Sequence, residues 1–347
     1  FRSERETGLT VKKIFYTPLM PRDKARFIEG LCKKEFSAQR IKGEFFSAKF
    51  DDVCEAVNRH VEMAFATLPQ VSNFERVEKI LDTITPRLHN KILLSTKTLE
   101  HRRERIKKVA VESLSRLIEL DKASEFHPQI FEQRFHDDKT FDDVEINLNG
   151  QIDRIDLSGD GKYFLIIDYK TGKASISLKK IYHGLNLQLA IYLGAAENLE
   201  EIGGREAGAM LYCLLKIPSK SGRTDSDAAA EADKELKMPG LIRVDEAIKN
   251  AVDSTEKFVD FKKDNLVARA DFQTIIDYAE KILETTAEKI LNGCIEVKPA
   301  KFSADDDACK FCLYSALCNF DRSTNEILEP INGKPADIIS EMAKALT

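Results

Sequence analysis

The sequence predicts an α/β fold, in which a mixed central β-sheet is flanked by helices, and three observations support this. Strand patterns dominate residues 126–216, helical spacing dominates the segments on both sides, and the strand pattern Tyr163–Asp168 is apolar on both faces. A strand with two apolar faces belongs in the covered centre of a sheet rather than at its edge. The order of three strands, a helix and a further strand favours a mixed sheet with helices packed against it.

The first 125 residues are expected to be mostly helical. Apolar residues recur at helical spacing in Asp51–Leu68. A second helix is expected over Asn73–Thr85, where Pro86 ends it, and a long basic helix over about Thr96–Leu120.

The strands of the predicted sheet come next. A short strand, Gln129–Phe135, and a long one, Val144–Leu157, precede the turn Ser158–Gly161, which leads into the apolar strand. The elements expected after it are the helix Ser177–Leu199, the strand Gly208–Lys216, and the helices Val244–Phe258 and Asp271–Leu291.

These patterns divide the chain into four expected regions. Residues 1–125 are the helical N-terminal region and residues 126–216 the core of the fold. Residues 217–240 are polar, rich in Ala, Asp and Lys, and poorly periodic, so we expect a flexible loop there. Residues 241–347 hold the C-terminal helices and a group of cysteines.

Composition excludes several classes of protein. The net charge of −5 gives no general attraction to nucleic acid, so any DNA contact must come from a local basic patch such as His101–Lys108. No apolar run suits a membrane helix, no signal peptide opens the chain, and seven cysteines do not suggest a secreted disulfide scaffold, so we expect a cytoplasmic protein. The absent initiator Met suggests a fragment of a longer chain. No phosphate-binding loop is present, so no ATPase motor is expected.

The residues that carry chemistry lie on the two strands that flank the turn. If these strands pair with Leu157 opposite Lys162, Asp153 and Asp168 lie on one face within diagonal reach. Lys170 shares that face because strand side chains alternate. The sequence therefore predicts that two carboxylates and a lysine converge at one end of the sheet.

This set of side chains suits metal-dependent cleavage of a phosphodiester. Carboxylate oxygens bind Mg²⁺ or Mn²⁺, and the metal stabilises charge on the attacked phosphate and activates a bound water. A nearby lysine can position that water or balance charge in the transition state. Glu132, on the preceding strand, is a candidate third carboxylate. A polar hairpin with solvated side chains is the alternative, which the apolar strand leading to Asp168 makes less attractive.

Two further positions are open to two interpretations. Gln188 and Tyr192 are four apart on the next predicted helix, so they share a face that either contacts substrate phosphate or packs on the sheet. His60 lies on the apolar stripe of its helix, where it is either a hydrogen-bonded core residue or a metal ligand.

The cysteine group has the spacing of a metal site but is one ligand short. Cys309, Cys312 and Cys318 are three thiols in a short segment, whereas tetrahedral zinc and iron–sulfur clusters need four ligands. Cys213 and Cys54 are expected to serve packing. The residues alone leave Cys294 and Cys32 open as the fourth ligand, and they leave the metal open as well.

Together these motifs resemble a known family. GQIDRID, IIDYKTG and LQLAIYL occur in the order found in PD-(D/E)XK nuclease domains of the RecB/AddB type, with their restriction-endonuclease-like core. The similarity covers roughly residues 75–325 and is closest to the C-terminal nuclease domain of the B subunit of AddAB helicase–nucleases. It continues through FHPQIFEQRF and NGCIEVKPAKF to CKFCLYSALCNFD.

The resemblance implies a role for each site residue. Asp153 and Asp168 match the family's metal-binding carboxylates and Lys170 its catalytic lysine. Glu132 matches an additional acidic residue, Gln188 and Tyr192 match the QxxxY motif, and His60 matches a metal-ligand histidine. The family's 4Fe–4S cluster implies Cys309, Cys312 and Cys318 as ligands with Cys32 as the fourth, and zinc is the alternative metal.

The expected function is therefore a Mg²⁺-dependent exonuclease. By resemblance it acts on single-stranded DNA, on the 5′-terminated strand, in double-strand-break repair and beside an AddA-like helicase partner. The alternative is a catalytically weak DNA-binding or scaffold module that keeps the nuclease fold for docking.

Overall fold

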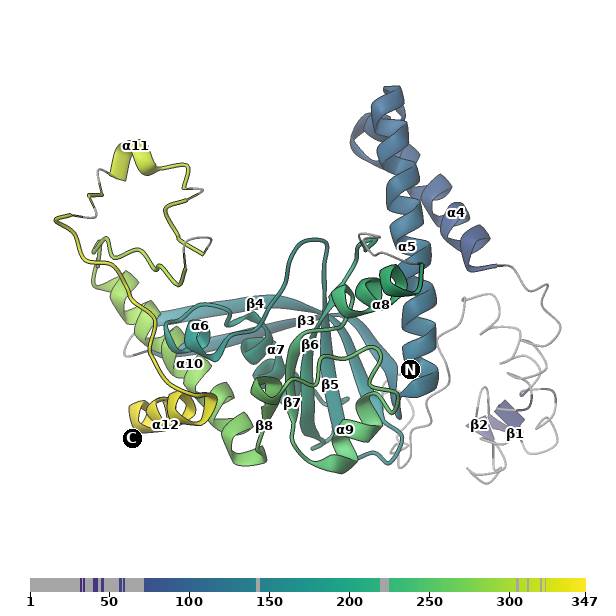
Figure 1. Ribbon diagram of the computed structural model, residues 1–347. Coiled ribbons are helices and arrows are strands. Elements are labelled where there is room, and N and C mark those ends of the chain that lie inside the picture. The colour runs from purple at the N-terminus through teal and green to yellow at the C-terminus, as the bar shows by residue number, and fades with distance from the viewer. Residues whose placement is uncertain are drawn as a thin grey trace. The chain divides into compact units, whose positions relative to one another are not determined.

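The computed structural model describes residues 72–141, 144–218, 225–303, 306–310, 312–318, 320–321 and 323–347, with Cys32, Lys34, Arg40–Lys42, Phe45–Phe46, Ala56–Val57 and Arg59 (Figure 1). Contacts divide the chain into two units, Phe1–Ile84 and Thr85–Thr347.

The first unit contains a predicted helix and an unexpected strand pair. Helix α4 (Asn73–Ile84) begins where the sequence predicts, and Ser72 caps it, because Ser72 Oγ accepts the Glu75 N–H at 3.2 Å. Strands β1 (Arg40–Lys42) and β2 (Phe45–Phe46) pair antiparallel, a strand pair that the sequence did not predict. Most of the helix predicted over residues 51–68 lies outside the described residues.

The second unit begins with two short 3₁₀ turns and a long helix. The turns are η2 (Thr85–Arg87) and η3 (His89–Leu94). Helix α5 (Lys97–Ala123) confirms the predicted basic helix. Thr96 caps it, since its side chain accepts the Leu99 N–H at 3.3 Å.

The centre of this unit is a mixed six-stranded sheet in the order β3-β4-β5-β6-β7-β8. Neighbouring strands are antiparallel except for the pairs β5–β6 and β7–β8, which are parallel. The sheet continues beyond residue 216, the expected end of the core. The strands are β3 (Phe126–Phe141), β4 (Val144–Ser158), β5 (Tyr163–Lys170), β6 (Glu206–Leu214), β7 (Gly240–Arg243) and β8 (Leu266–Val267).

The register of β4 on β5 differs by two residues from the one predicted. Leu157 pairs with Phe164 rather than with Lys162. The turn is longer than expected because Ser158 closes it, its hydroxyl accepting the Tyr163 N–H at 2.9 Å, while Asp160 accepts the Lys162 N–H at 3.1 Å. A shift of two residues keeps every side chain on its predicted face.

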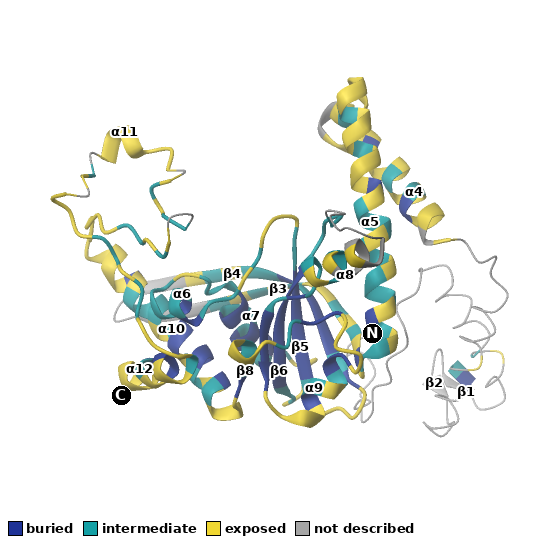
Figure 2. Ribbon diagram, viewed as in Figure 1, coloured by how far each residue is buried: buried dark blue, intermediate teal, exposed yellow. Residues whose placement is uncertain are grey.

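Strand β5 is buried on both faces, as predicted for a central strand (Figure 2). On one face, Phe164 and Ile166 pack in a cluster with α6 (Leu178–Tyr182), α7 (Gln188–Glu197), α10 (Arg269–Leu291) and α12 (Pro335–Leu346). On the other face, Leu165 and Ile167 pack with Leu120 of α5, with α9 (Glu246–Val252) and with Phe258. The two faces are therefore closed by different helices.

The helix predicted over Ser177–Leu199 is two helices. Helix α6 ends at Tyr182 and α7 begins at Gln188. The break contains two residues with left-handed backbone, Gly184 at φ +77° and Asn186 at φ +58°, which helical backbone excludes. As a result Gln188 is the first residue of α7 rather than a residue in mid-helix.

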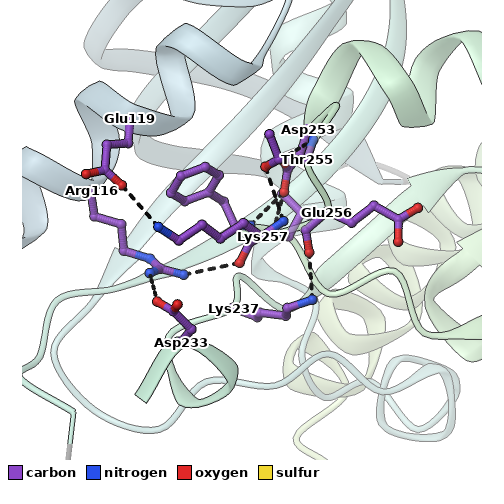
Figure 3. A network of polar contacts seen from close by, with 10 residues as sticks. Arg116, Glu119, Asp233, Lys237, Asp253, Thr255, Glu256 and Lys257 are labelled. Atoms are coloured by element: carbon purple, nitrogen blue, oxygen red, sulfur yellow. Dashed lines mark hydrogen bonds and ion pairs between the residues drawn. The ribbon is translucent and has the colours of Figure 1, made fainter. Parts of the chain in front are cut away.

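The segment expected to be a flexible loop, residues 217–240, contains helix α8 (Asp225–Glu235). Figure 3 shows how polar contacts tie it to its surroundings. Arg116 of α5 donates to Asp233 of α8 at 3.1 Å and to the Lys257 carbonyl at 3.4 Å, and Lys257 pairs with Glu119 at 3.3 Å. The prediction of a flexible loop is wrong for α8. This helix has no large apolar residue at helical spacing, and it makes polar contacts with neighbouring segments instead.

Among the helices of the described residues, none is both long enough and apolar enough to cross a membrane.

Candidate active site

The predicted residues meet where β5 ends. Asp168 and Lys170 point to the face of the sheet that α7 covers. Side chains alternate along a strand, and both residues lie an even number of positions from Phe164 and Ile166, which pack on that face. The break between α6 and α7 brings Gln188 to the start of α7 on the same face.

Gln188 joins this group by two hydrogen bonds. Its Oε1 accepts from Lys170 Nζ at 2.7 Å, and its Nε2 donates to Asp168 Oδ1 at 3.0 Å. Lys170 Nζ also lies 2.6 Å from Asp168 Oδ2. Tyr192, one turn along α7, has its hydroxyl oxygen 3.2 Å from Gln188 Nε2. The structure thus brings together four of the predicted site residues, and Gln188 is the centre of the network.

Asp153 approaches the same strand end from β4. Its Oδ2 accepts the backbone N–H of Tyr169 at 2.8 Å, just beyond the last pair of the β4–β5 ladder, Arg154 with Ile167. Ile152 and Ile155 both lie in the α7-side cluster although they are three residues apart, so strict alternation is broken between them. Asp153 lies within this change of face, and its carboxylate reaches the backbone at the end of β5.

Burial dominates the electrostatics of Asp168, which is only 4% exposed. Loss of solvent raises its pKa above the ordinary aspartate value, and the charge of Asp153 adds to the rise, whereas the Lys170 ammonium opposes it. Its Oδ2 is buried and lies 2.6 Å from the Lys170 ammonium, the cation that opposes this rise. A buried carboxylate oxygen of this kind gains from a cation beside it.

The donor set fits one hydrated divalent cation. Mg²⁺ in proteins is held by one or two carboxylates together with waters and substrate phosphate, and Asp153 and Asp168 supply two carboxylates. Within the described residues no group of three or more His, Cys, Asp or Glu side chains is close enough to hold a metal without such help. Asp153 and Asp168 are therefore the residues that would hold it, and the metal would supply the charge stabilisation that phosphodiester hydrolysis needs.

Sequence reasoning missed Tyr212 of β6. It pairs in register with Asp168, and Lys170 Nζ lies over its ring, 5.4 Å from the centroid. Burial, followed by the charge of Asp168, raises the pKa of Tyr212 to about 12, so its hydroxyl stays protonated. The sequence held a signal for this residue. Tyr212 is a polar aromatic residue in an apolar strand, two positions after Met210, and both side chains lie on the face that α7 covers.

Glu132 does not join the network in the contacts of the described residues. Its backbone has φ +51°, and its carboxylate accepts a hydrogen bond from Gln151. The left-handed backbone turns the side chain from the direction that simple alternation predicts. The role that the resemblance gives to Glu132 stays a prediction.

The remaining predicted metal ligands, His60 of the Mg²⁺ site and the cysteines of the iron–sulfur site, are not gathered in the described residues. His60 lies outside them, and Cys32 belongs to the first unit, so its distance from the C-terminal cysteines is not defined. Cys309 is partly exposed, whereas Cys312, Cys318 and Cys294 are exposed. Cys213 is buried in β6, where burial raises its pKa to about 11, as expected of a packing residue.

Comparison with known proteins decides the family. The sequence profile of the PD-(D/E)XK nuclease superfamily matches residues 26–319, most of the chain. The chain belongs to this superfamily. The mixed sheet flanked by helices, with an Asp-x-Lys at the end of a buried strand, agrees with a PD-(D/E)XK nuclease, so the prediction of a nuclease domain is confirmed.

Curated relatives of this PD-(D/E)XK nuclease share one name, the B subunit of an ATP-dependent helicase/deoxyribonuclease. The relative from Alkaliphilus metalliredigens is 29% identical over 86% of this chain, and that from Clostridioides difficile 28% identical over 97%. The relative from Clostridium botulinum strain Loch Maree is 34% identical over 70% of this chain. The chain spans 28%, 30% and 24% of the length of these three relatives.

Proposed function

We propose that this chain is the nuclease domain of a B subunit of an AddAB-type helicase–nuclease and hydrolyses DNA with Mg²⁺ or Mn²⁺. The substrate is single-stranded DNA, on the 5′-terminated strand, as double-strand breaks are processed. An AddA-like helicase subunit is the partner, and the reaction takes place in the cytoplasm.

One observation carries this proposal. Gln188 holds Asp168 and Lys170 in fixed positions at the end of β5, where Asp153 also arrives. Two carboxylates can bind the cation, and a lysine held 2.6 Å from one of them is placed to orient the attacking water. The names of the curated relatives support DNA as the substrate.

Digestion of labelled DNA tests the proposal. The full chain is incubated with a single-stranded oligonucleotide labelled at either end, with Mg²⁺, Mn²⁺ or EDTA. We expect metal-dependent shortening that removes the 5′ label first. Asp168→Ala should lower the rate about a thousandfold or more, because the loss of one metal ligand costs several kcal/mol in the transition state.

The control is Glu200→Ala, which removes an exposed carboxylate from the segment after α7. It should cut at the wild-type rate. If Asp168→Ala cuts DNA at the wild-type rate, the proposal that Asp168 is a metal ligand of the active site is wrong. A wild-type chain that binds DNA but does not cut it with either metal would favour the alternative, a docking module that keeps the fold.

For the cysteines, we propose a structural 4Fe–4S cluster held by Cys309, Cys312, Cys318 and Cys32. The donor chemistry supports it, because thiolates in this spacing suit iron–sulfur clusters as well as zinc. Protein purified without oxygen should contain about four iron atoms and four sulfides per chain. One equivalent of zinc without iron would contradict the cluster, and full iron content in Cys32→Ser would move the fourth ligand to Cys294.

A further inference from the structure

The hairpin of β3 and β4 is much longer than its attachment to the sheet. Its two strands pair from Phe126 with Ser158 to Phe141 with Val144, whereas β4 pairs with β5 only over Arg154–Leu157. Residues 133–141 and 144–152 therefore form an arm that runs past the rest of the sheet (Figure 1). We refer to these residues as the hairpin arm.

One face of the hairpin arm packs against the catalytic helix α7. The ring of Phe135 meets Tyr192 edge-on, with centroids 5.7 Å apart. Gly150 lies opposite Phe135, and a Cβ at Gly150 would be 2.4 Å from that ring and 3.3 Å from Tyr192. Tyr192 is the residue that contacts Gln188. The hairpin arm thus reaches the catalytic network through a single layer of aromatic side chains.

The other face of the hairpin arm is polar. Arg134 pairs in register with Gln151, and His136 with Asn149. These four residues, together with Phe135 and Gly150, line an open cavity of about 540 Å³. Pockets for small molecules have volumes of roughly 300–1,000 Å³, so one nucleotide fits.

The groups in this cavity suit a nucleotide. His136 Nδ1 contacts Asn149 Oδ1, and Gln151 Nε2 donates to Glu132. Arg134 is exposed, and within the described residues its guanidinium has no ion pair. A guanidinium presents five N–H donors in a fork that matches phosphate oxygens.

We propose that this cavity binds a nucleotide of the DNA strand outside the cleavage site itself. Arg134 holds its phosphate, and the amides of Asn149 and Gln151 contact its base or sugar. This subsite rests on the proposed nuclease function and adds a substrate contact outside the metal-binding carboxylates.

Steady-state cleavage by the full chain tests the subsite. The variants are Arg134→Ala and Asn149→Ala, with Lys162→Ala as the matched control. Lys162 is an exposed cation in the β4–β5 turn, and its partner is Asp160 of the same turn. Arg134→Ala should raise KM for a single-stranded oligonucleotide about tenfold with kcat within about twofold of wild type, as expected when a contact to bound substrate is lost.

A binding measurement separates this proposal from the nuclease function itself. In the Asp168→Ala background, fluorescence anisotropy of a labelled single-stranded oligonucleotide reports binding without cleavage. Adding Arg134→Ala should weaken binding about tenfold, whereas adding Lys162→Ala should not. If both substitutions have equal effects on KM and on binding, the subsite is excluded. If wild type does not cleave DNA, the proposed function fails, and the anisotropy result still decides the subsite.

Discussion

The carboxylate of Asp153 accepts the backbone N–H of Tyr169 at 2.8 Å, so a side chain continues the contact between β4 and β5 after their ladder has ended. One oxygen of Asp153 is therefore committed to the backbone of the strand that carries Asp168 and Lys170. The same residue that we propose as a metal ligand also fixes the distance between the two strands.

These two roles of Asp153 can be separated by substitution. Asp153→Asn keeps an oxygen that can accept the Tyr169 N–H but removes the charge, so cleavage should be lost while thermal stability stays near that of wild type. Asp153→Ala should lose cleavage and also about 1 kcal/mol of stability, the usual contribution of one hydrogen bond. Equal melting temperatures for the two variants would show that the hydrogen bond does not support the fold.

Lys170 should be needed for turnover but not for metal binding. Lysine is not a ligand for Mg²⁺ or Mn²⁺, and its removal takes a positive charge away from the site. In Lys170→Met, calorimetry should show Mn²⁺ affinity equal to or above that of wild type, while kcat falls about a hundredfold or more. Loss of Mn²⁺ affinity in this variant would contradict the division of roles between Lys170 and Asp168.

Metal binding should weaken on acidification at a higher pH than an ordinary aspartate would cause. Burial raises the pKa of Asp168, and protons compete with the cation for its carboxylate. Mn²⁺ affinity followed by calorimetry should therefore fall as the pH drops through this raised pKa. A fall that begins only near pH ~4, the ordinary aspartate range, would be inconsistent with the burial seen here.

The same shift has a consequence for stability without metal. Because the folded-state pKa of Asp168 is raised, protonation of Asp168 stabilises the folded protein. This stabilisation is complete below the unfolded-state pKa and is lost as the pH rises through the folded-state pKa. Metal-free Asp168→Asn should thus melt at a higher temperature than wild type at neutral pH. This difference should disappear in acid.

Gly150 should not tolerate a methyl group. A Cβ there would lie 2.4 Å from the ring of Phe135, which itself packs on Tyr192. Gly150→Ala should cost about 1–3 kcal/mol in urea unfolding, as overpacked sites do, and should lower kcat by moving Tyr192. Gly172→Ala is the control, since nothing lies within 4 Å of a Cβ at Gly172. Restored stability in Gly150→Ala/Phe135→Leu would confirm the clash as the cause.

The buried ion pair of Arg154 and Asp156 should be essential for stability but not for catalysis. Arg154 Nε donates to Asp156 Oδ1 at 2.6 Å, and both residues are buried on the sheet face opposite the active site. Asp156→Ala leaves a guanidinium uncompensated and should cost about 3–5 kcal/mol in urea unfolding. Glu200→Ala, which removes an exposed carboxylate, should stay within about 0.5 kcal/mol of wild type. If Asp156→Ala is as stable as Glu200→Ala, the ion pair contributes nothing.

The sequence predicted the parts of the site that depend on alternation alone. The apolar run into Asp168 identified the central strand, and the parity of Asp168 and Lys170 identified their shared face. The register error did not matter for this purpose, because a shift of two residues leaves each side chain on the same face of the sheet. Gln188 and Tyr192 were also placed on one face correctly, since both belong to α7.

The remaining differences come from backbone that departs from alternation or helical period. Asn186 and Gly184 break the predicted helix, and their Gly-x-Asn pattern is a usable signal for a helix end. At Glu132 a left-handed backbone in a non-glycine residue gives no sequence signal. Helix α8 was missed because it has no large apolar residue at helical spacing, although four of its 11 residues are Ala, the best helix former.

The order of the catalytic residues along the chain has a consequence for how such a site can spread and change. Asp168, Lys170, Gln188 and Tyr192 all lie within one strand and the second helix after it. These residues thus come from a short contiguous stretch of the chain that also includes α6 and α7, whereas α10 and α12, which cover the same face of the sheet, come from the C-terminal part. Sequence changes in that C-terminal part can therefore alter the cover of the sheet while the order and spacing of the candidate site residues stay the same.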